Sequence, residues 1–67
     1  MRERYIVRLD LARKVSTLSI ENADTGERLA EFPVRDVREG RRRRNQLCET
    51  LSEYADEVIG KTNDWRS

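Results

Sequence analysis

Residues 31–44 read EFPVRDVREGRRRR, and the hydrophobic pattern of the chain changes within this stretch. Before it, apolar and polar side chains alternate with a period of two, which is typical of half-buried strands. After it, apolar side chains recur at spacings of three and four residues, which is typical of an amphipathic helix. Pro33 lacks a backbone donor and therefore favours a strand end or a sheet edge. The stretch predicts a strand-to-helix junction near residue 35.

Three segments before the junction have strand patterns. Residues 4–10 alternate, with Tyr5, Val7 and Leu9 on one face. Residues 15–21 are rich in β-branched and hydroxyl side chains, and residues 27–34 resume the alternation. These segments predict a three-stranded antiparallel meander.

The segment NADTG at residues 22–26 is the clearest turn signal in the chain. Asp24 can accept a hydrogen bond from the backbone two residues on, and Gly26 can adopt a positive φ without steric cost. A register with Leu18 opposite Ala30 keeps the apolar side chains of both strands on one face. In the same register Ser16 lies opposite Phe32.

A helix is predicted to follow the meander over residues 37–59. Asp36 and Glu39 have the spacing of a capping box, so the helix is expected to begin near Val37. Its apolar side chains fall within an arc of about 140°. Gly60 is expected just beyond its end. The apolar arc consists of Leu47, Cys48, Leu51, Tyr54, Ala55, Val58 and Ile59.

The predicted fold class is therefore α+β: a three-stranded antiparallel β-meander followed by one long amphipathic helix packed on one sheet face (βββα). Residues 1–60 are expected to form a single small domain, and residues 61–67 a short C-terminal tail. The expected core consists of Tyr5, Val7, Leu9, Leu18, Ile20, Phe32, Val34, Leu47, Leu51, Tyr54, Ala55 and Val58. Because such a core is thin, association with a partner would help the fold.

Several function classes are disfavoured by composition. The chain has no histidine and one cysteine, Cys48, so it offers neither a catalytic triad nor a zinc ligand set, and no disulfide can form within it. Its three glycines match no phosphate-binding loop. We therefore predict a non-enzymatic protein without metal or cofactor. No apolar run is long enough for a membrane span or a signal peptide, which predicts a cytoplasmic protein without membrane contact.

The charges are unevenly distributed although they nearly cancel. Residues 35–44 contain six basic and two acidic side chains, whereas residues 45–67 contain two basic and five acidic ones. Basic side chains near a helix N-terminus oppose the helix dipole, which favours a functional role for them. Guanidinium groups bind phosphate oxygens bidentately and stay protonated. The candidate residues for binding an anion, most simply a nucleic-acid backbone, are Arg35, Arg38, Arg41, Arg42 and Arg43.

A protein–protein interaction module is the alternative function. The helix is basic in its first half and acidic in its second, so two antiparallel copies would be complementary, as in a homodimer; docking on a larger protein is equally compatible. Arg44 falls inside the apolar arc, which predicts a packing or ion-pair role for it. The outer sheet face is expected to expose apolar side chains. The interface candidates are Ile6, Val15, Leu29, Arg44, Glu49 and Glu53.

Overall fold

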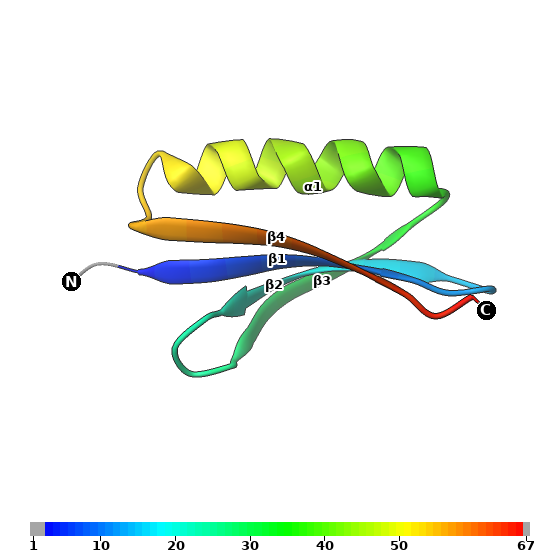
Figure 1. Ribbon diagram of the computed structural model, residues 1–67, viewed down its shortest axis with the longest axis horizontal. Helices are drawn as coiled ribbons and strands as arrows, with labels where there is room; N and C mark the ends of the chain where they lie inside the picture. The colour runs from blue at the N-terminus through cyan, green and yellow to red at the C-terminus, as the bar shows by residue number, and fades with distance from the viewer. Residues whose placement is uncertain (1–2, 67) are drawn as a thin grey trace.

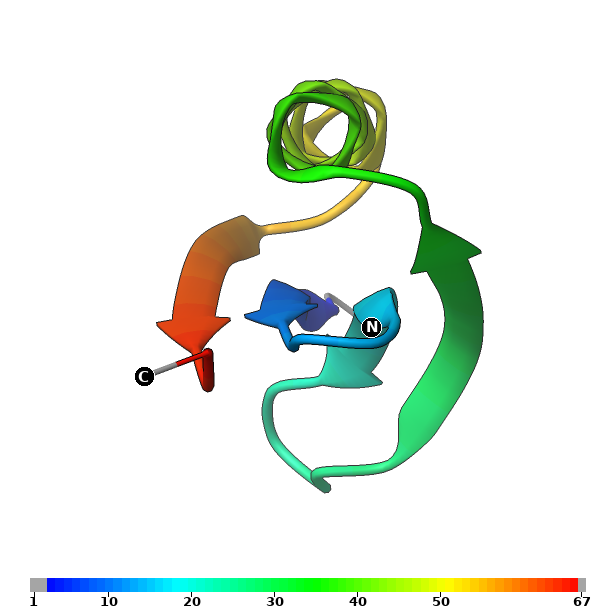
Figure 2. The same ribbon diagram turned by 90° about the vertical axis from the view of Figure 1, so that its right-hand side faces the viewer.

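The computed structural model describes residues 3–66 and consists of a mixed four-stranded sheet with a helix on one face (Figures 1 and 2). The elements in chain order are β1 (Arg4–Leu11), β2 (Ser16–Asn22), β3 (Arg28–Val34), α1 (Val37–Ser52) and β4 (Glu57–Asp64). The strand order is β3-β2-β1-β4. Strands β1, β2 and β3 pair antiparallel, whereas β4 pairs parallel to β1. The connection through α1 therefore leads from one edge strand of the sheet, β3, to the other edge strand, β4. The predicted α+β class is confirmed.

The prediction that the sheet has only three strands and that the helix extends to residue 59 is wrong. Helix α1 ends at Ser52, and residues 57–64 form β4. Tyr54 lies beyond the helix and is 73% exposed, so it is not a core residue. The physical reason is that β1 carries much of the buried core, and its backbone groups need partners on both sides. Strand β4 supplies the second partner along all eight residues of β1.

The local sequence of β4 is also suited to an extended conformation. Val58 and Ile59 are β-branched, which favours strands, although their spacing from Leu51 also fits a helical face. In the sheet, Val58 pairs with Tyr5 and Ile59 pairs with Ile6. The two side chains consequently point to opposite faces of the sheet.

The turn between β2 and β3 is confirmed, and its register differs from the predicted one. Gly26 has φ of 77°, as expected. The side chain that shapes the turn is that of Asn22, whose Oδ1 accepts hydrogen bonds from the backbone N–H groups of Asp24 and Thr25. Leu18 pairs with Phe32 and not with Ala30.

The register differs by two residues because the turn is longer and β3 contains a bulge. The turn is closed by Asn22 and Glu27, which adds one residue. The pairing then steps from Arg28 to Ala30, which leaves Leu29 without a cross-strand partner. The face of each predicted core residue is unchanged by this shift, since it involves an even number of residues.

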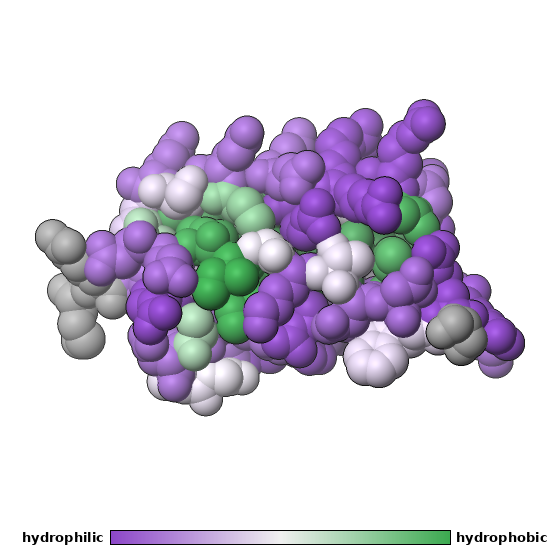
Figure 3. Space-filling view, viewed as in Figure 1, coloured by the Kyte–Doolittle hydropathy of each residue, from purple (hydrophilic) through white to green (hydrophobic). Residues whose placement is uncertain are grey.

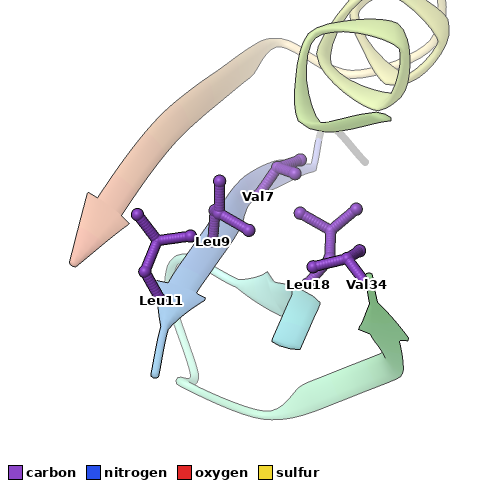
Figure 4. Close-up of a cluster of buried hydrophobic side chains, with 5 residues drawn as sticks. All are labelled: Val7, Leu9, Leu11, Leu18 and Val34. Atoms are coloured by element: carbon purple, nitrogen blue, oxygen red, sulfur yellow. The ribbon is translucent and has the colours of Figure 1, made fainter. Parts of the chain in front are cut away.

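The core lies between the sheet and α1 (Figure 4). Five apolar side chains of residues 3–66 are buried: Val7, Leu9, Leu11, Leu18 and Val34. Leu11 lies one residue beyond the segment predicted as the first strand, residues 4–10. Partly buried side chains surround this cluster: Phe32, Val37, Leu47, Cys48, Leu51 and Val58. Tyr5, Ile20 and Ala55 are half-buried at its margin.

The start of α1 is fixed by a cap and by a close approach to β1. Asp36 is the N-cap, and its Oδ1 accepts a hydrogen bond from the Glu39 N–H at 2.8 Å, as the capping-box spacing predicts. Glu39 Oε2 accepts from the Arg35 N–H at 3.3 Å. Gly40 is buried, and a Cβ atom there would lie 2.8 Å from Leu9 Cδ1. Glycine therefore lets the first turns of the helix lie close to β1.

Candidate functional site

The fold separates charges toward the two ends of an elongated molecule that measures 38 × 21 × 16 Å. One end is formed by the turn at residues 12–15, by residues 35–44 and by residues 64–66, and we call it the basic end. These segments meet at the right of Figure 1 and face the viewer in Figure 2. Its positive side chains are Arg13, Lys14, Arg35, Arg38, Arg41, Arg42, Arg43, Arg44 and Arg66.

The opposite end, which we call the acidic end, contains the turn at residues 23–27 and the segment from Glu49 to Glu57 (Figure 1). Its negative side chains are Glu3, Asp24, Glu27, Glu49, Glu53, Asp56 and Glu57. Arg4 forms ion pairs there with Asp24 at 3.2 Å and with Glu57 at 3.5 Å. The molecule thus carries opposite charges at its two ends.

The carboxylates of the basic end already accept hydrogen bonds within the molecule. Asp36 caps the helix, and Glu39 accepts from the Arg35 N–H and forms an ion pair with Arg43 Nε at 3.2 Å. Asp10, which lies on β1 next to the basic end, accepts from Asn63 Nδ2 and from Trp65 Nε1, each at 3.1 Å. These groups are thus already engaged near the arginines.

The third carboxylate of the basic end, Asp64, is held by Arg66. Arg66 Nε lies 2.9 Å from Asp64 Oδ1, and Arg66 NH2 lies 2.8 Å from Oδ2. Hydrogen bonds from the side chain and backbone of Arg66 lower the pKa of Asp64 from 3.8 to about 2, and the charge of Arg41 contributes weakly. Asp64 therefore stays ionised throughout the neutral range, paired with its own neighbour in sequence.

A groove at the basic end gathers part of the predicted arginine cluster. We call it the basic groove; it is an open hollow of about 750 Å³ lined by Lys14, Val15, Pro33, Val34, Arg35, Glu39, Arg42 and Arg43. The side chains of Lys14, Arg35 and Arg42 form no hydrogen bond or ion pair with another described residue. Four cations and one already paired carboxylate therefore surround this groove.

Lys14 was missed by the sequence analysis, and the strand pattern contained the signal for it. Strand β1 ends near Leu11 and β3 ends at Val34. Since the first and third strands of a meander run in the same direction, their ends lie at the same end of the sheet. The turn that follows β1 must therefore lie near the start of the helix that follows β3.

The remaining predicted arginines lie on other sides of α1. Arg44 donates hydrogen bonds to Thr62 Oγ1 on β4 and to Asn45 Oδ1. Arg41 lies near enough to Asp64 to influence its pKa. Arg38 is exposed. The helix therefore divides the cluster between a side facing β3, with Arg42 and Arg43, and a side facing β4, with Arg41 and Arg44.

A second hollow adjoins the basic groove and shares Arg42 and Arg43 with it. It has a volume of about 650 Å³ and is lined by Leu18, Phe32, Arg42, Arg43, Gln46, Leu47, Glu49 and Thr50. It exists because α1 packs mainly against β1 and β4 and leaves β2 and β3 less covered. Phe32 is thereby brought next to two arginines, a juxtaposition of an aromatic ring and cations that the linear sequence does not reveal.

The apolar interface candidates do not form one surface. Val15 is 57% exposed and lines the basic groove, whereas Leu29 is 50% exposed near the bulge of β3. Ile6 is half-buried on the outer sheet face beside Ile59. Of the acidic candidates, Glu49 and Glu53 are both exposed in the C-terminal part of the helix region.

The outer sheet face is dominated by ion pairs. Glu21 pairs with Arg8 at 3.1 Å and with Arg28 at 3.3 Å, and Arg28 also pairs with Glu31. The hydrogen bonds that Arg28 donates to Glu21 and Glu31 raise the pKa of Arg28 above its ordinary value. Ser19 is only 1% exposed on this face. The apolar outer surface that the sequence suggested is therefore largely a network of charged side chains.

Cys48 is a residue of α1, and its side chain lies next to β4. A Cβ atom built at Gly60 would be 3.3 Å from its Sγ. Burial raises the pKa of the Cys48 thiol, and the nearby Arg44 only partly offsets this effect. The thiol is therefore kept protonated at neutral pH, which suits a packing role.

Within residues 3–66 no helix is long and apolar enough to cross a membrane, and no group of three potential ligands could hold a metal ion. In comparisons with known proteins, no family model, curated protein or solved structure matches the chain.

Proposed function

We propose that the protein is a small non-enzymatic binding module whose basic end contacts an anionic partner, most simply the phosphate backbone of a nucleic acid. The observation that carries this proposal is the basic groove. It brings Lys14 together with Arg35 and Arg42, and their side chains have no partner in the described chain. Arginine and lysine at such a site attract phosphates, and each contact releases counterions from the nucleic acid.

The arrangement supports contacts to the backbone more than sequence recognition. Asn45 and Gln46 could contact bases, but Asn45 Oδ1 already accepts hydrogen bonds from Arg44. Gln46 lines the hollow beside the basic groove. The binding is therefore expected to be nearly indifferent to sequence, since phosphate contacts carry no base information.

Single-stranded and duplex partners are to be compared in the same experiment. The hollow next to the basic groove offers Phe32 to an unstacked base, and arginines accompany it on one rim. A base in a duplex cannot reach such a hollow without leaving its stack. Tighter binding of a single strand than of a duplex of the same length would place a base near Phe32.

The decisive measurement is a titration of labelled single-stranded and duplex DNA and RNA at about 50 mM and about 200 mM salt. With three or four phosphate contacts, log affinity should fall against log salt with a slope of about −3 to −4. Replacing Lys14, Arg35 and Arg42 together by glutamine should reduce the slope by about one unit for each lost contact.

A matched pair of single variants separates the site from overall charge. Arg42→Gln and Lys61→Gln each remove one exposed positive charge, the first beside the basic groove and the second on β4. The proposal requires Arg42→Gln to weaken binding more than Lys61→Gln does. Equal effects would mean that only net charge matters.

The second candidate is a protein–protein interaction in which the arginines pair with carboxylates. The charge separation between the basic and acidic ends favours it, because such a charge pattern is complementary to a second copy in antiparallel orientation. If no nucleic acid binds at the lower salt, and replacing Lys14, Arg35 and Arg42 by glutamine abolishes self-association, the arginines of the basic groove belong to that interface.

A further inference from the structure

The β4 edge of the sheet is open along its whole length. Strand β4 pairs with β1 on one side over eight residues, and no other strand flanks it within residues 3–66. It contains no proline, and its middle residues from Gly60 to Thr62 are exposed. A free edge of this kind presents unpaired backbone donors and acceptors and is a template for another strand.

Apolar side chains accompany this free edge. Figure 3 looks onto the β4 side and shows a hydrophobic area below the C-terminal part of α1. Three half-buried apolar residues lie in the first half of β4 or just before it: Ala55, Val58 and Ile59. The edge therefore combines free backbone hydrogen-bonding groups with apolar surface that a partner can cover.

We infer that a second copy of this chain occupies the β4 edge, with the two β4 strands antiparallel and a two-fold axis between them. The charge separation argues for this occupant, because antiparallel strands bring each basic end beside the acidic end of the other copy. The result is a continuous eight-stranded sheet with both helices on one face. This inference goes beyond the proposed function and uses a different surface.

The position of α1 over β4 fits this arrangement. Helix α1 packs mainly against β1 and β4, so its axis lies above these two strands. A second β4 at the usual strand spacing would place the two helix axes about 10 Å apart. Helices in proteins pack at about 8–10 Å. The helices could therefore be in contact without distortion of the sheet.

The middles of the strand and the helix also coincide. Gly60, near the centre of β4, faces the side chains of Cys48 and Arg44 near the centre of α1. A two-fold axis through the middle of β4 therefore passes beside the middle of the helix. The helix flank on that side carries Arg41, Asn45, Cys48 and Ser52 at helical spacing.

The charges on this flank suit an antiparallel pair of helices. In an antiparallel pair Arg41 would lie beside the C-terminal part of the other helix, where the helix dipole is negative. The arginines that face β3 remain free, because the basic groove lies on the other side of the helix. Self-association and phosphate binding thus use different arginines.

The first test measures association of the unmodified chain by sedimentation velocity over a concentration series. A reversible dimer is expected, weaker at high salt because charge complementarity contributes. Hydrogen exchange at low and high concentration should show extra protection of β4 amides in the dimer, while the β3 edge is unchanged. A monomer at millimolar concentration, or a dimer without added β4 protection, would overturn the inference.

The second test uses Ile59→Lys, with Leu29→Lys as the matched control. Both place a lysine on an edge strand, Ile59 on β4 and Leu29 on β3. In the dimer the new lysine would lie diagonally across from Lys61 of the other copy and repel it. We expect at least a tenfold weaker dimer for Ile59→Lys and unchanged association for Leu29→Lys. The reverse result would assign the interface to β3. If the unmodified chain forms the dimer but binds no nucleic acid, only the proposed function is contradicted.

Discussion

The two edges of the sheet differ in how readily another strand could pair with them. Strand β3 has a bulge at Leu29 and a proline at position 33, and two hollows separate it from the helix. Strand β4 is regular, has no proline and lies close under α1. Bulges and prolines discourage further strand pairing, whereas a regular edge invites it. The two sides of one helix thus meet edges of opposite character, and the two proposed kinds of recognition use different sides.

The largest expected difference between the edges is in stability. Val58 on β4 packs against the core, whereas Leu29 on β3 is half exposed. Val58→Asp would bury an unpaired carboxylate and should lower the free energy of unfolding by about 3 kcal/mol. Leu29→Asp should change it by less than about 0.5 kcal/mol. Urea unfolding at low protein concentration measures both. Similar losses would show that β4 contributes no more to the fold than β3 does.

A smaller difference is expected between the two sides of the helix. Arg44 hydrogen-bonds Thr62 on β4, so Arg44→Gln should cost about 1 kcal/mol of unfolding free energy. Arg42 has no such partner in the described chain, and its charge opposes the helix dipole. Arg42→Gln should therefore leave stability unchanged or raise it by a few tenths of a kcal/mol.

The control for this pair is Arg44→Lys, which keeps the charge and loses the planar guanidinium. If the contact with Thr62 stabilises β4, Arg44→Lys should be less stable than the unmodified chain. Thermal unfolding of the variants at matched concentration gives the order. Greater destabilisation by Arg42→Gln than by Arg44→Gln would contradict the division of the arginines between the two sides.

The smallest effect concerns Asp64 at the end of β4. Its folded pKa of about 2 lies below the ordinary value of 3.8, so its ionised form stabilises the fold above that ordinary value. This contribution is lost as the pH falls through 2. An NMR titration should give a midpoint for Asp64 near 2 in the unmodified chain. In Arg66→Gln the midpoint should move toward 3.8, and in Arg41→Gln it should move much less. Equal shifts in both variants would show that the pKa of Asp64 depends on the total positive charge around it and not on its hydrogen bonds with Arg66.

Much of the N-terminal half could be predicted from local patterns. The three predicted strands agree with β1, β2 and β3 within one residue at each end, and the helix begins at Val37 as expected. Alternation, a strong turn signal and a cap are properties of neighbouring residues, so they can be recognised without knowledge of the rest of the fold. The exact register of β2 and β3 could not, because a bulge is not encoded by alternation.

The C-terminal half was mispredicted because its pattern is ambiguous. Val58 and Ile59 fit the spacing of a helical face and also have the β-branched side chains of a strand. The choice is made by β1, which lies far away in sequence and needs a second partner. Similarly, the division of the arginines between β3 and β4 depends on where α1 crosses the sheet. The charge cluster was visible in the sequence, but its neighbours Lys14 and Phe32 required the topology.

The pairing of β1 with β4 has a consequence for how the chain folds. Paired residues of these strands are 53 positions apart, as in Asp10 and Asn63. Closing so long a loop costs more entropy than forming the hairpins of β1, β2 and β3. We therefore expect β4 to pair with β1 only after these hairpins have formed. Until β4 pairs with β1, one side of β1 is an unpaired sheet edge, and the apolar side chains of β1 that are buried in the folded chain are less covered. The refolding rate should therefore be limited by this single long-range step, and the chain is most prone to aggregation before it.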